Sequence, residues 1–203
     1  MELRARLRGR TLDWMMRQMN ELRPEVLEGA EGDVLEVGFG TGLNVPFYPP
    51  GTKKLVGLDP NPADGLPALE ERVRAATFGV ERCALRADGM LPFDAGRFDT
   101  VVTTWTLCSI ADHRRALDEM RRVLRPGGRY LFIEHGRAPA ERTARWQDRV
   151  NPLWRRLTGG CNMNRPIDLI VQEGGFELER LARFRHTGPG LLAHMYRGVA
   201  KAV

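Results

Sequence analysis

The sequence has little cysteine and no conventional metal motif. Its three cysteines, Cys83, Cys108 and Cys161, are far apart and odd in number. No CxxC pair and no Cys/His group has the spacing of a zinc site along the chain. We therefore expect neither a disulfide framework nor a metal site, and a reducing, cytoplasmic setting is the simplest interpretation.

Long hydrophobic runs are also absent. Charged or polar residues interrupt every stretch that could approach the roughly 18 apolar residues of a membrane span. The basic start of the chain is not followed by the apolar segment of a signal peptide. These absences predict a chain that neither crosses a membrane nor carries a secretory signal.

Lysine is scarce, since only three of the 31 basic residues are lysine and the net charge is +5. The arginines are scattered along the whole chain and form only short pairs. Such dispersal is more typical of a solvated surface than of a phosphate-binding or nucleic-acid-binding patch. No added domain or basic stretch with interleaved aromatics is present, so the charge does not favour a nucleic-acid partner.

The 203 residues, 42% of them hydrophobic and 28% charged, suit one globular domain that can bury a continuous core. From about residue 33, short apolar runs alternate with helix-like segments. Strands are expected at Asp33–Val37, Lys54–Leu58, Ala84–Ala87, Thr100–Thr104, Arg129–Glu134, Glu177–Phe184 and Leu192–Ala200. Helices are expected near 42–47, 64–76, 112–124 and 165–174. This alternation predicts a doubly wound, Rossmann-like α/β fold, with a mostly parallel sheet and helices on both faces. The last two strands lack a helix between them, which predicts an antiparallel strand at one edge.

Two further segments stand outside this alternation. Residues 1–30 carry apolar residues at three- and four-residue spacing and are expected to form an N-terminal helical cap on the core or over a cofactor cleft. The alternative is a helix that contacts a membrane surface without spanning it. Residues 137–164 interrupt the alternation after a strand, and we expect them to form a helical lid above the carboxyl ends of the strands, where open α/β sheets bind ligands.

The most informative motif is glycine-rich. After the apolar strand ending at Val37, glycines stand at positions 38, 40 and 42. Glycines let the backbone turn sharply and approach a ligand closely, and a helix opening just beyond would offer unpaired N–H groups. Asp59 ends the next strand, where a carboxylate can accept both hydroxyls of a ribose. Asp88 follows the third strand, within reach of an adenine edge. Together these features predict a nucleotide-like cofactor.

The spacing separates two cofactor classes. The dinucleotide fingerprint GxGxxG needs its third glycine at position 43, which is Leu43 here. Acidic Glu36, just before the loop, suits the cationic amino group of a methionine moiety and would repel a pyrophosphate. The loop therefore favours S-adenosyl-L-methionine over NAD(P).

These residues carry a family resemblance. ExGxGxG at 36–42, Asp59, the DGMLPF run at 88–93 and LRPGG at 124–128 resemble the type 11 class I S-adenosylmethionine-dependent methyltransferases. The resemblance implies a seven-stranded sheet with a reversed final hairpin. It also implies that the cofactor is bound by Glu36, Gly38, Phe39, Gly40, Gly42, Asn44, Asp59, Pro60, Asp88, Gly89, Met90 and Thr104.

A narrower resemblance concerns the methyl acceptor. The TWTLCS run at 104–109, Glu134-His135, the GCN run at 160–162 and Arg165 are similar to the methyltransferase-like alkyl thiol methyltransferases. This resemblance implies a small, lipophilic acceptor, a thiol above all, with phenols and quinols as alternatives. His135 is the candidate general base for deprotonating such a group, the alternative being a histidine that simply packs at a strand end. Cys108 is expected to be a small buried residue rather than a nucleophile.

Two alternatives remain at this level. The Asn/Asp-Pro-Pro-aromatic run of enzymes that methylate base amines is replaced by TTWT at 103–106, which argues against a nucleic-acid methyltransferase. A cofactor-binding regulatory module without turnover would carry the same loop and the same acidic residues. The cofactor motif therefore does not separate that module from an active enzyme.

Overall fold

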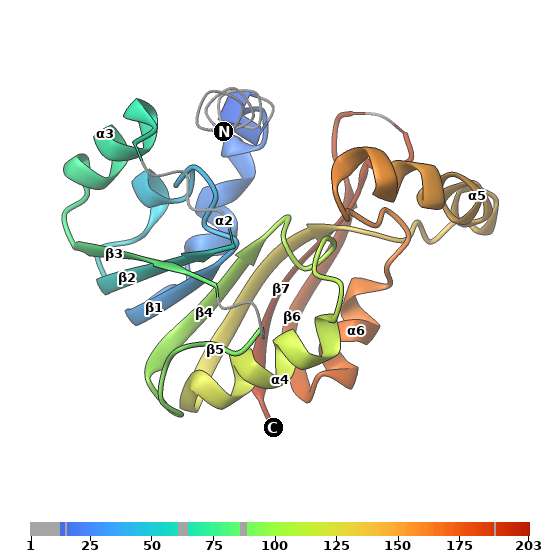
Figure 1. The fold of residues 1–203 in the computed structure, drawn as a ribbon. Helices are drawn as coiled ribbons and strands as arrows, with labels where there is room; N and C mark the ends of the chain where they lie inside the picture. Colours follow the sequence, from blue (N-terminus) through green and yellow to red (C-terminus); the bar gives the residue numbers. More distant parts are fainter. Residues whose placement is uncertain (1–12, 15, 61–64, 86–88, 189) are drawn as a thin grey trace.

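The computed structural model describes residues 13–14, 16–60, 65–85, 89–188 and 190–203, drawn in colour in Figure 1. Seven strands form one sheet in the order β3-β2-β1-β4-β5-β7-β6. The strands are β1 (Gly32–Val37), β2 (Thr52–Asp59), β3 (Gly79–Ala84), β4 (Phe98–Thr104), β5 (Leu124–His135), β6 (Phe176–Arg185) and β7 (His194–Ala202). The helices are α2 (Arg23–Leu27), α3 (Pro67–Ala75), α4 (His113–Val123), α5 (Glu141–Thr158) and α6 (Ile167–Glu173), with short 3-10 turns η1 (Asn20–Leu22) and η2 (Val45–Phe47).

The sheet is parallel from β3 to β5, and only β7 runs the other way. β7 pairs antiparallel with β5 on one side and with β6 on the other. The expectation of a mostly parallel, Rossmann-like sheet with an antiparallel last strand is confirmed. The carboxyl ends of β1, β2, β4 and β5 therefore meet at one edge, which is where open α/β sheets bind ligands.

Both faces of the sheet are covered, and residue alternation explains how. Successive strand residues point to opposite faces. Val101 packs in one hydrophobic cluster with α4 and α6, whereas its neighbour Val102 packs in the other with α2 and α3. Leu35 and Val34 divide in the same way on β1. The predicted helices on both faces are thus present (Figure 1).

Two predicted elements were wrong. The third strand lies at Gly79–Ala84 and shares only Ala84 with the expected Ala84–Ala87, of which residues 86 and 87 lie outside the described residues. As an edge strand paired only with β2, it is half exposed and carries charged Glu81 and Arg82, so its apolar signal is weak. The helix expected near 42–47 is only the turn η2, because Pro46 leaves one short turn and Pro49 and Pro50 end it.

Helix α5 occupies most of the segment 137–164 and follows the carboxyl end of β5 (Figure 1). Buried Gln147 fixes it in place. Its side-chain oxygen accepts from the Ala138 N–H at 2.8 Å, and its amide nitrogen donates to the carbonyl oxygens of Gly136 and Met163 at 3.0 and 2.9 Å. Among the described residues, no helix combines the length and apolar content needed to cross a bilayer.

Candidate functional site

The glycine loop leaves β1 through three glycines in the left-handed region, Gly38 (φ +83°), Gly40 (φ +54°) and Gly42 (φ +70°). A Cβ on Gly38 would lie 2.1 Å from the Thr106 hydroxyl oxygen, so this position admits no side chain. A Cβ on Gly40 would meet nothing closer than 3.9 Å. The Gly40 backbone therefore faces open space at the carboxyl edge of the sheet, as a ligand-binding loop requires.

Asp59 ends β2 beside this loop. The Gly40 N–H donates to one carboxylate oxygen of Asp59 at 3.0 Å. This bond joins the ends of β1 and β2 and places an acidic group against the open loop. The structure thus brings together Gly40 and Asp59, two of the residues that the sequence predicts to bind the cofactor.

Glu36 is buried at the carboxyl end of β1, with only 2% of its surface exposed. One carboxylate oxygen accepts from the Tyr48 hydroxyl at 2.8 Å and the other from the Asn44 amide at 2.9 Å. The same amide donates to the Thr104 hydroxyl at 3.0 Å. Predicted residues from three segments therefore form one hydrogen-bond network.

Burial raises the pKa of Glu36 to about 7, against the hydrogen bond from Tyr48, the charge of Arg23 and the amide of Asn44, which lower it. A buried carboxylate is stabilised by a cation beside it. Glu36 is thus a group whose ionisation would be favoured by a bound ammonium ion.

The N-terminal segment reaches this network through Arg23. Its guanidinium donates to the Asn44 amide oxygen at 2.5 Å and lies 5.0 Å from the ring centroid of Trp105. Burial lowers the pKa of Arg23 to about 10, although the nearby Glu36 carboxylate raises it. Trp105 itself has φ +50°, which a bulky residue rarely adopts, and its indole N–H is buried without a hydrogen-bond partner in the described structure. A buried indole N–H without an acceptor is uncommon in folded proteins.

A second set of contacts links the N-terminal segment to the glycine loop through Arg72. Arg72 of α3 donates to the Thr41 carbonyl at 2.7 Å and to the Asp13 carboxylate at 2.7 Å. Burial would raise the pKa of Asp13, but its bonds to Arg72, Thr41 and Arg17 lower it below the usual value. Through Arg72, the described part of the N-terminal segment is thus linked to the glycine loop, while residues 1–12 of the expected cap lie outside the described residues.

The remaining predicted cofactor residues divide into three groups. Phe39 is buried against Gly57 in the core, so only its backbone can face a ligand. Pro60 and Met90 are exposed and Gly89 is partly exposed, all near the ends of β2 and β3. Asp88 lies outside the described residues.

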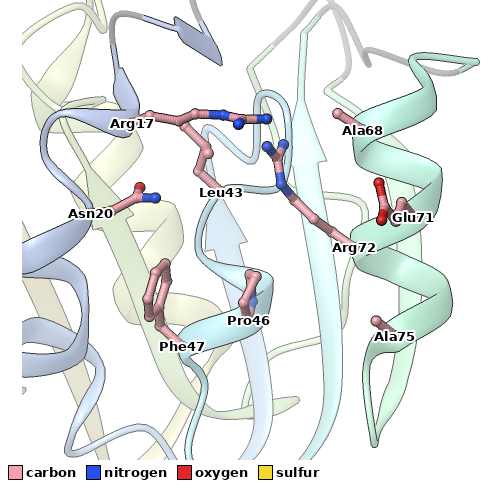
Figure 2. Close-up of a pocket in the computed structure, with 9 residues that line it drawn as sticks. All are labelled: Arg17, Asn20, Leu43, Pro46, Phe47, Ala68, Glu71, Arg72 and Ala75. Atoms are coloured by element: carbon pink, nitrogen blue, oxygen red, sulfur yellow. The ribbon is translucent and has the colours of Figure 1, made fainter.

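Two surface pockets flank the loop. The larger, about 360 Å³, lies between the N-terminal segment, η2 and α3, and Figure 2 shows Arg17 and Arg72 extending into its upper part. It lacks Asp59 and Glu36. The smaller, about 280 Å³, is lined by Val37 at the end of β1, Gly89 and Asp112 before α4. This second pocket also lacks both carboxylates, but Gly89, one of the predicted cofactor residues, lines it.

The residues of the narrower resemblance lie at the ends of β4 and β5, where Glu134 is fully buried. Its carboxylate accepts three backbone N–H bonds, from Thr106 at 2.9 Å, Leu107 at 2.8 Å and Cys108 at 3.2 Å. Burial raises the pKa of Glu134, against these three donors. The loop that follows β4 is therefore shaped by a carboxylate of β5.

Next to Glu134, the imidazole of His135 meets two cysteines. His135 Nε2 lies 3.0 Å from the Cys161 sulfur, and the Cys161 sulfur lies 4.0 Å from that of Cys108. The Trp154 indole N–H donates to the Cys161 sulfur at 3.4 Å. His135 and Cys108 are buried, whereas Cys161 is partly exposed.

Sequence reasoning missed several members of this site. Tyr48 and Arg23 gave no motif, and Glu134 was noted only as part of the narrower resemblance, because their roles depend on buried contacts across distant segments. The expectation of no metal site rested on spacing along the chain. The structure nevertheless brings Cys108, His135 and Cys161 together from three segments, with ligand atoms all within 4.8 Å of one another.

The comparisons with known proteins agree with this geometry. The family described as a methyltransferase domain matches residues 35–132. The chain is 39% identical to thiol S-methyltransferase TMT1A of Homo sapiens over 150 residues, which cover 73% of this chain and 61% of that protein. It is 34% identical to thiol S-methyltransferase TMT1B of Rattus norvegicus over 180 residues, 86% of this chain and 73% of that protein. The first match thus spans about three fifths of its human relative's length.

A solved structure supports the fold. N-methyltransferase NodS of Bradyrhizobium japonicum, in complex with S-adenosyl-L-homocysteine, superposes with a TM-score of 0.65 over 92% of this chain and 86% of that chain. The two sequences are 18% identical, so the likeness speaks for the arrangement of strands and helices.

Proposed function

Because the chain belongs to the S-adenosylmethionine-dependent methyltransferases, we propose that it transfers a methyl group to the sulfur of a small, lipophilic thiol. The observation that carries the choice of acceptor is the identity of 39% to a thiol S-methyltransferase. The residues that carry the narrower resemblance, including Cys108, Glu134 and His135, meet at one place in the structure.

The chain's own groups fit the methyl donor. The open backbone at Gly40, the acidic Asp59 beside it and the buried Glu36 suit a ligand with a ribose and a cationic amino group. When bound, S-adenosyl-L-methionine supplies a methyl group that its sulfonium already activates. The protein therefore has to place the acceptor in line and exclude water.

On the acceptor side, the chain offers a shaped and partly buried site. Glu134 fixes the loop after β4, and α5, fixed by Gln147, closes the adjoining side. We propose that 137–164 acts as the lid over the acceptor and that the first 30 residues act as a cap on the cofactor loop. We also propose a cytoplasmic location and no nucleic-acid substrate.

His135 constrains how an acceptor could be deprotonated. Its Nε2 faces the Cys161 sulfur, while its Nδ1 is buried without a hydrogen-bond partner among the described residues. If His135 is the general base, Nδ1 is the nitrogen that receives the proton. That role stays a proposal.

Cofactor affinity should depend on pH through Glu36. The pKa of this carboxyl is raised from 4.5 to about 7, so the free protein holds a proton there below pH 7. Its contribution to stability is therefore present below pH 4.5 and is lost as the pH rises through about 7. An ammonium ligand requires the ionised form, so we expect the dissociation constant to rise about tenfold per pH unit below pH 7.

Calorimetric titration with S-adenosyl-L-methionine at pH values from about 5.5 to about 8.5, on both sides of the Glu36 pKa, measures this dependence. The matched control is Glu36→Gln, which keeps the shape and removes the titrating group. The variant should bind S-adenosyl-L-methionine more weakly than the wild type does at neutral pH, with a dissociation constant that does not change with pH. If the dissociation constant of the variant changed with pH as steeply as that of the wild type, Glu36 would not be the titrating group.

Gly38 and Gly40 of the loop should respond differently to replacement by alanine. Gly38→Ala places a Cβ 2.1 Å from the Thr106 hydroxyl oxygen at positive φ, so we expect a loss of several kcal/mol, about 3 or more, in the free energy of unfolding. Gly40→Ala meets open space and should cost only about 1 kcal/mol for its left-handed backbone.

Chemical denaturation measures the effect of each variant on stability, and cofactor titration measures its effect on binding. Gly40→Ala should stay folded yet lose cofactor affinity, because its methyl group enters the space above the loop. A Gly40→Ala variant with wild-type affinity would mean that the ligand does not approach this backbone.

The proposed function itself is tested by release of S-adenosyl-L-homocysteine with a panel of thiols, phenols and quinols. Transfer to thiols in preference to oxygen acceptors is the expected result. A protein that binds the cofactor tightly and turns over no acceptor would instead be the regulatory module of the same fold.

A further inference from the structure

The cluster of Cys108, His135 and Cys161 is not used by the cofactor site, and its residues come from three separate segments. Cys108 follows β4, His135 ends β5, and Cys161 follows α5. We propose that these three side chains bind one Zn²⁺ ion and leave its fourth position open to the acceptor thiol. The role assigned to the fourth position rests on the proposed function, whereas the metal site itself does not.

The distances suit tetrahedral zinc. With Zn–S bonds of about 2.3 Å and Zn–N bonds of about 2.0 Å, ligand atoms at tetrahedral angles lie about 3.8 Å (S to S) and about 3.5 Å (S to N) apart. The two cysteine sulfurs are 4.0 Å apart and the His135 Nε2 is 3.0 Å from the Cys161 sulfur. These two distances differ from the tetrahedral values by about half an ångström or less, and the third pair, His135 Nε2 and the Cys108 sulfur, lies within 4.8 Å.

The ligands are fixed before any ion arrives. The Cys108 N–H is bound by Glu134 at 3.2 Å, and the Cys108 carbonyl accepts from the Asn162 backbone N–H at 2.9 Å and from its side-chain amide at 3.0 Å. These bonds join the two cysteine-bearing loops. The Trp154 N–H already donates to the Cys161 sulfur, which is the kind of outer contact that orients a metal-bound thiolate.

Charge balance favours a divalent cation with thiolate ligands. Two thiolates and a neutral imidazole neutralise Zn²⁺, so the ion can be buried without a net charge. A thiolate in the fourth position would add one negative charge. Arg165 is half-buried, donates to the Leu107 carbonyl at 2.5 Å, and its charge interacts with both cysteines, so it can offset that charge.

Three protein ligands with an open position are typical of catalytic rather than structural zinc. Cys161 is partly exposed, which leaves an approach from solvent. An acceptor thiol would replace the bound water, forming a Zn–S bond and releasing its proton to solvent. The sulfur lone pair would then form the new S–CH₃ bond as the sulfonium C–S bond breaks, with that electron pair left on S-adenosyl-L-homocysteine. In this arrangement His135 is a ligand and not the general base.

The test uses the full chain, reduced with a phosphine so that no small thiol competes. Zn²⁺ binding is measured against a chromophoric chelator, and Co²⁺ is used as a spectroscopic substitute. We expect one ion per chain, with thiolate-to-cobalt charge-transfer absorption. Cys108→Ser, Cys161→Ser and His135→Ala should each weaken binding by more than about 100-fold, because even an outer contact is worth about 10- to 100-fold.

Cys83→Ser is the matched control, because Cys83 lies on β3 outside the cluster, and it should bind zinc as the wild type does. A reduced wild-type protein that takes up no zinc overturns the proposal, as does binding that depends on Cys83. A Cys108–Cys161 disulfide with no zinc uptake after reduction overturns it too.

Activity separates the metal site from the proposed function. Chelation should abolish methyl transfer to a small thiol, added Zn²⁺ should restore it, and the thiol alone should shift the Co²⁺ spectrum. Unchanged thiol methylation after complete removal of zinc overturns the acceptor role while leaving the proposed function intact. Zinc binding by the predicted residues, with cofactor bound but no thiol methylated, supports the site and counts against the proposed function.

Discussion

Replacing Asp59 with alanine should weaken S-adenosyl-L-methionine binding by at least about 100-fold, because two hydrogen bonds from ribose hydroxyls to a carboxylate are each worth about 1.5–3 kcal/mol. Asp59 ends β2 and accepts from the Gly40 N–H at 3.0 Å, so the substitution also removes a contact that shapes the loop. Calorimetry on the folded variant gives the dissociation constant directly.

The conservative variant Asp59→Asn separates the two contributions, since it can still accept the Gly40 N–H. Its affinity should lie between those of the wild type and Asp59→Ala. Asp118→Ala is the surface control, because its carboxylate pairs only weakly with Arg121 at 3.4 Å. Unchanged affinity in Asp59→Ala would mean that the ribose site has been misplaced.

Replacing Glu134 with alanine should lower the free energy of unfolding by about 3–5 kcal/mol. The change leaves three buried N–H groups, those of residues 106, 107 and 108, without their acceptor. It also leaves a cavity at the end of β5, where Glu134 is fully buried. Urea denaturation followed by circular dichroism measures the loss.

Glu141→Ala is the matched control for Glu134, because Glu141 begins α5 with 83% of its side chain exposed and has only a distant partner. Its effect should stay within about 0.5 kcal/mol. A loss below about 1 kcal/mol in Glu134→Ala would show that solvent or a rearranged loop replaces the carboxylate. Glu134→Gln should fall between the two, since its amide can accept at only one of its two terminal atoms.

The fold and the cofactor loop were predictable because their signals are local. The apolar strand before Gly38 and the acidic residue that ends β2 can each be recognised from a few consecutive residues. The parallel sheet followed from the alternation of strands and helices, and the reversed final strand from the missing helix. Among the strands, β3 was displaced toward the N-terminus, because an exposed edge strand does not need an apolar face.

The rest of the site was not predictable because it depends on contacts between distant segments. Tyr48 and Arg23 reach Glu36 and Asn44 from a proline-rich turn and from the N-terminal segment. The cluster of Cys108, His135 and Cys161 spans residues 53 positions apart. Spacing rules describe metal sites built within one loop, so they do not detect ligands that a sheet edge brings together.

The position of β7 has a consequence for the order in which the chain can fold. β7 (His194–Ala202) lies between β5 and β6, although both precede it in the sequence. As the chain leaves the ribosome, β1 to β5 can pair as soon as each is made, whereas β6 has no partner in the sheet until β7 arrives. Formation of this half of the sheet is therefore governed by a late, long-range step, as non-local strand pairing generally is. Until that step, β5 is an open edge, and the backbone groups of Arg129–His135 that later pair with β7 are exposed to neighbouring molecules.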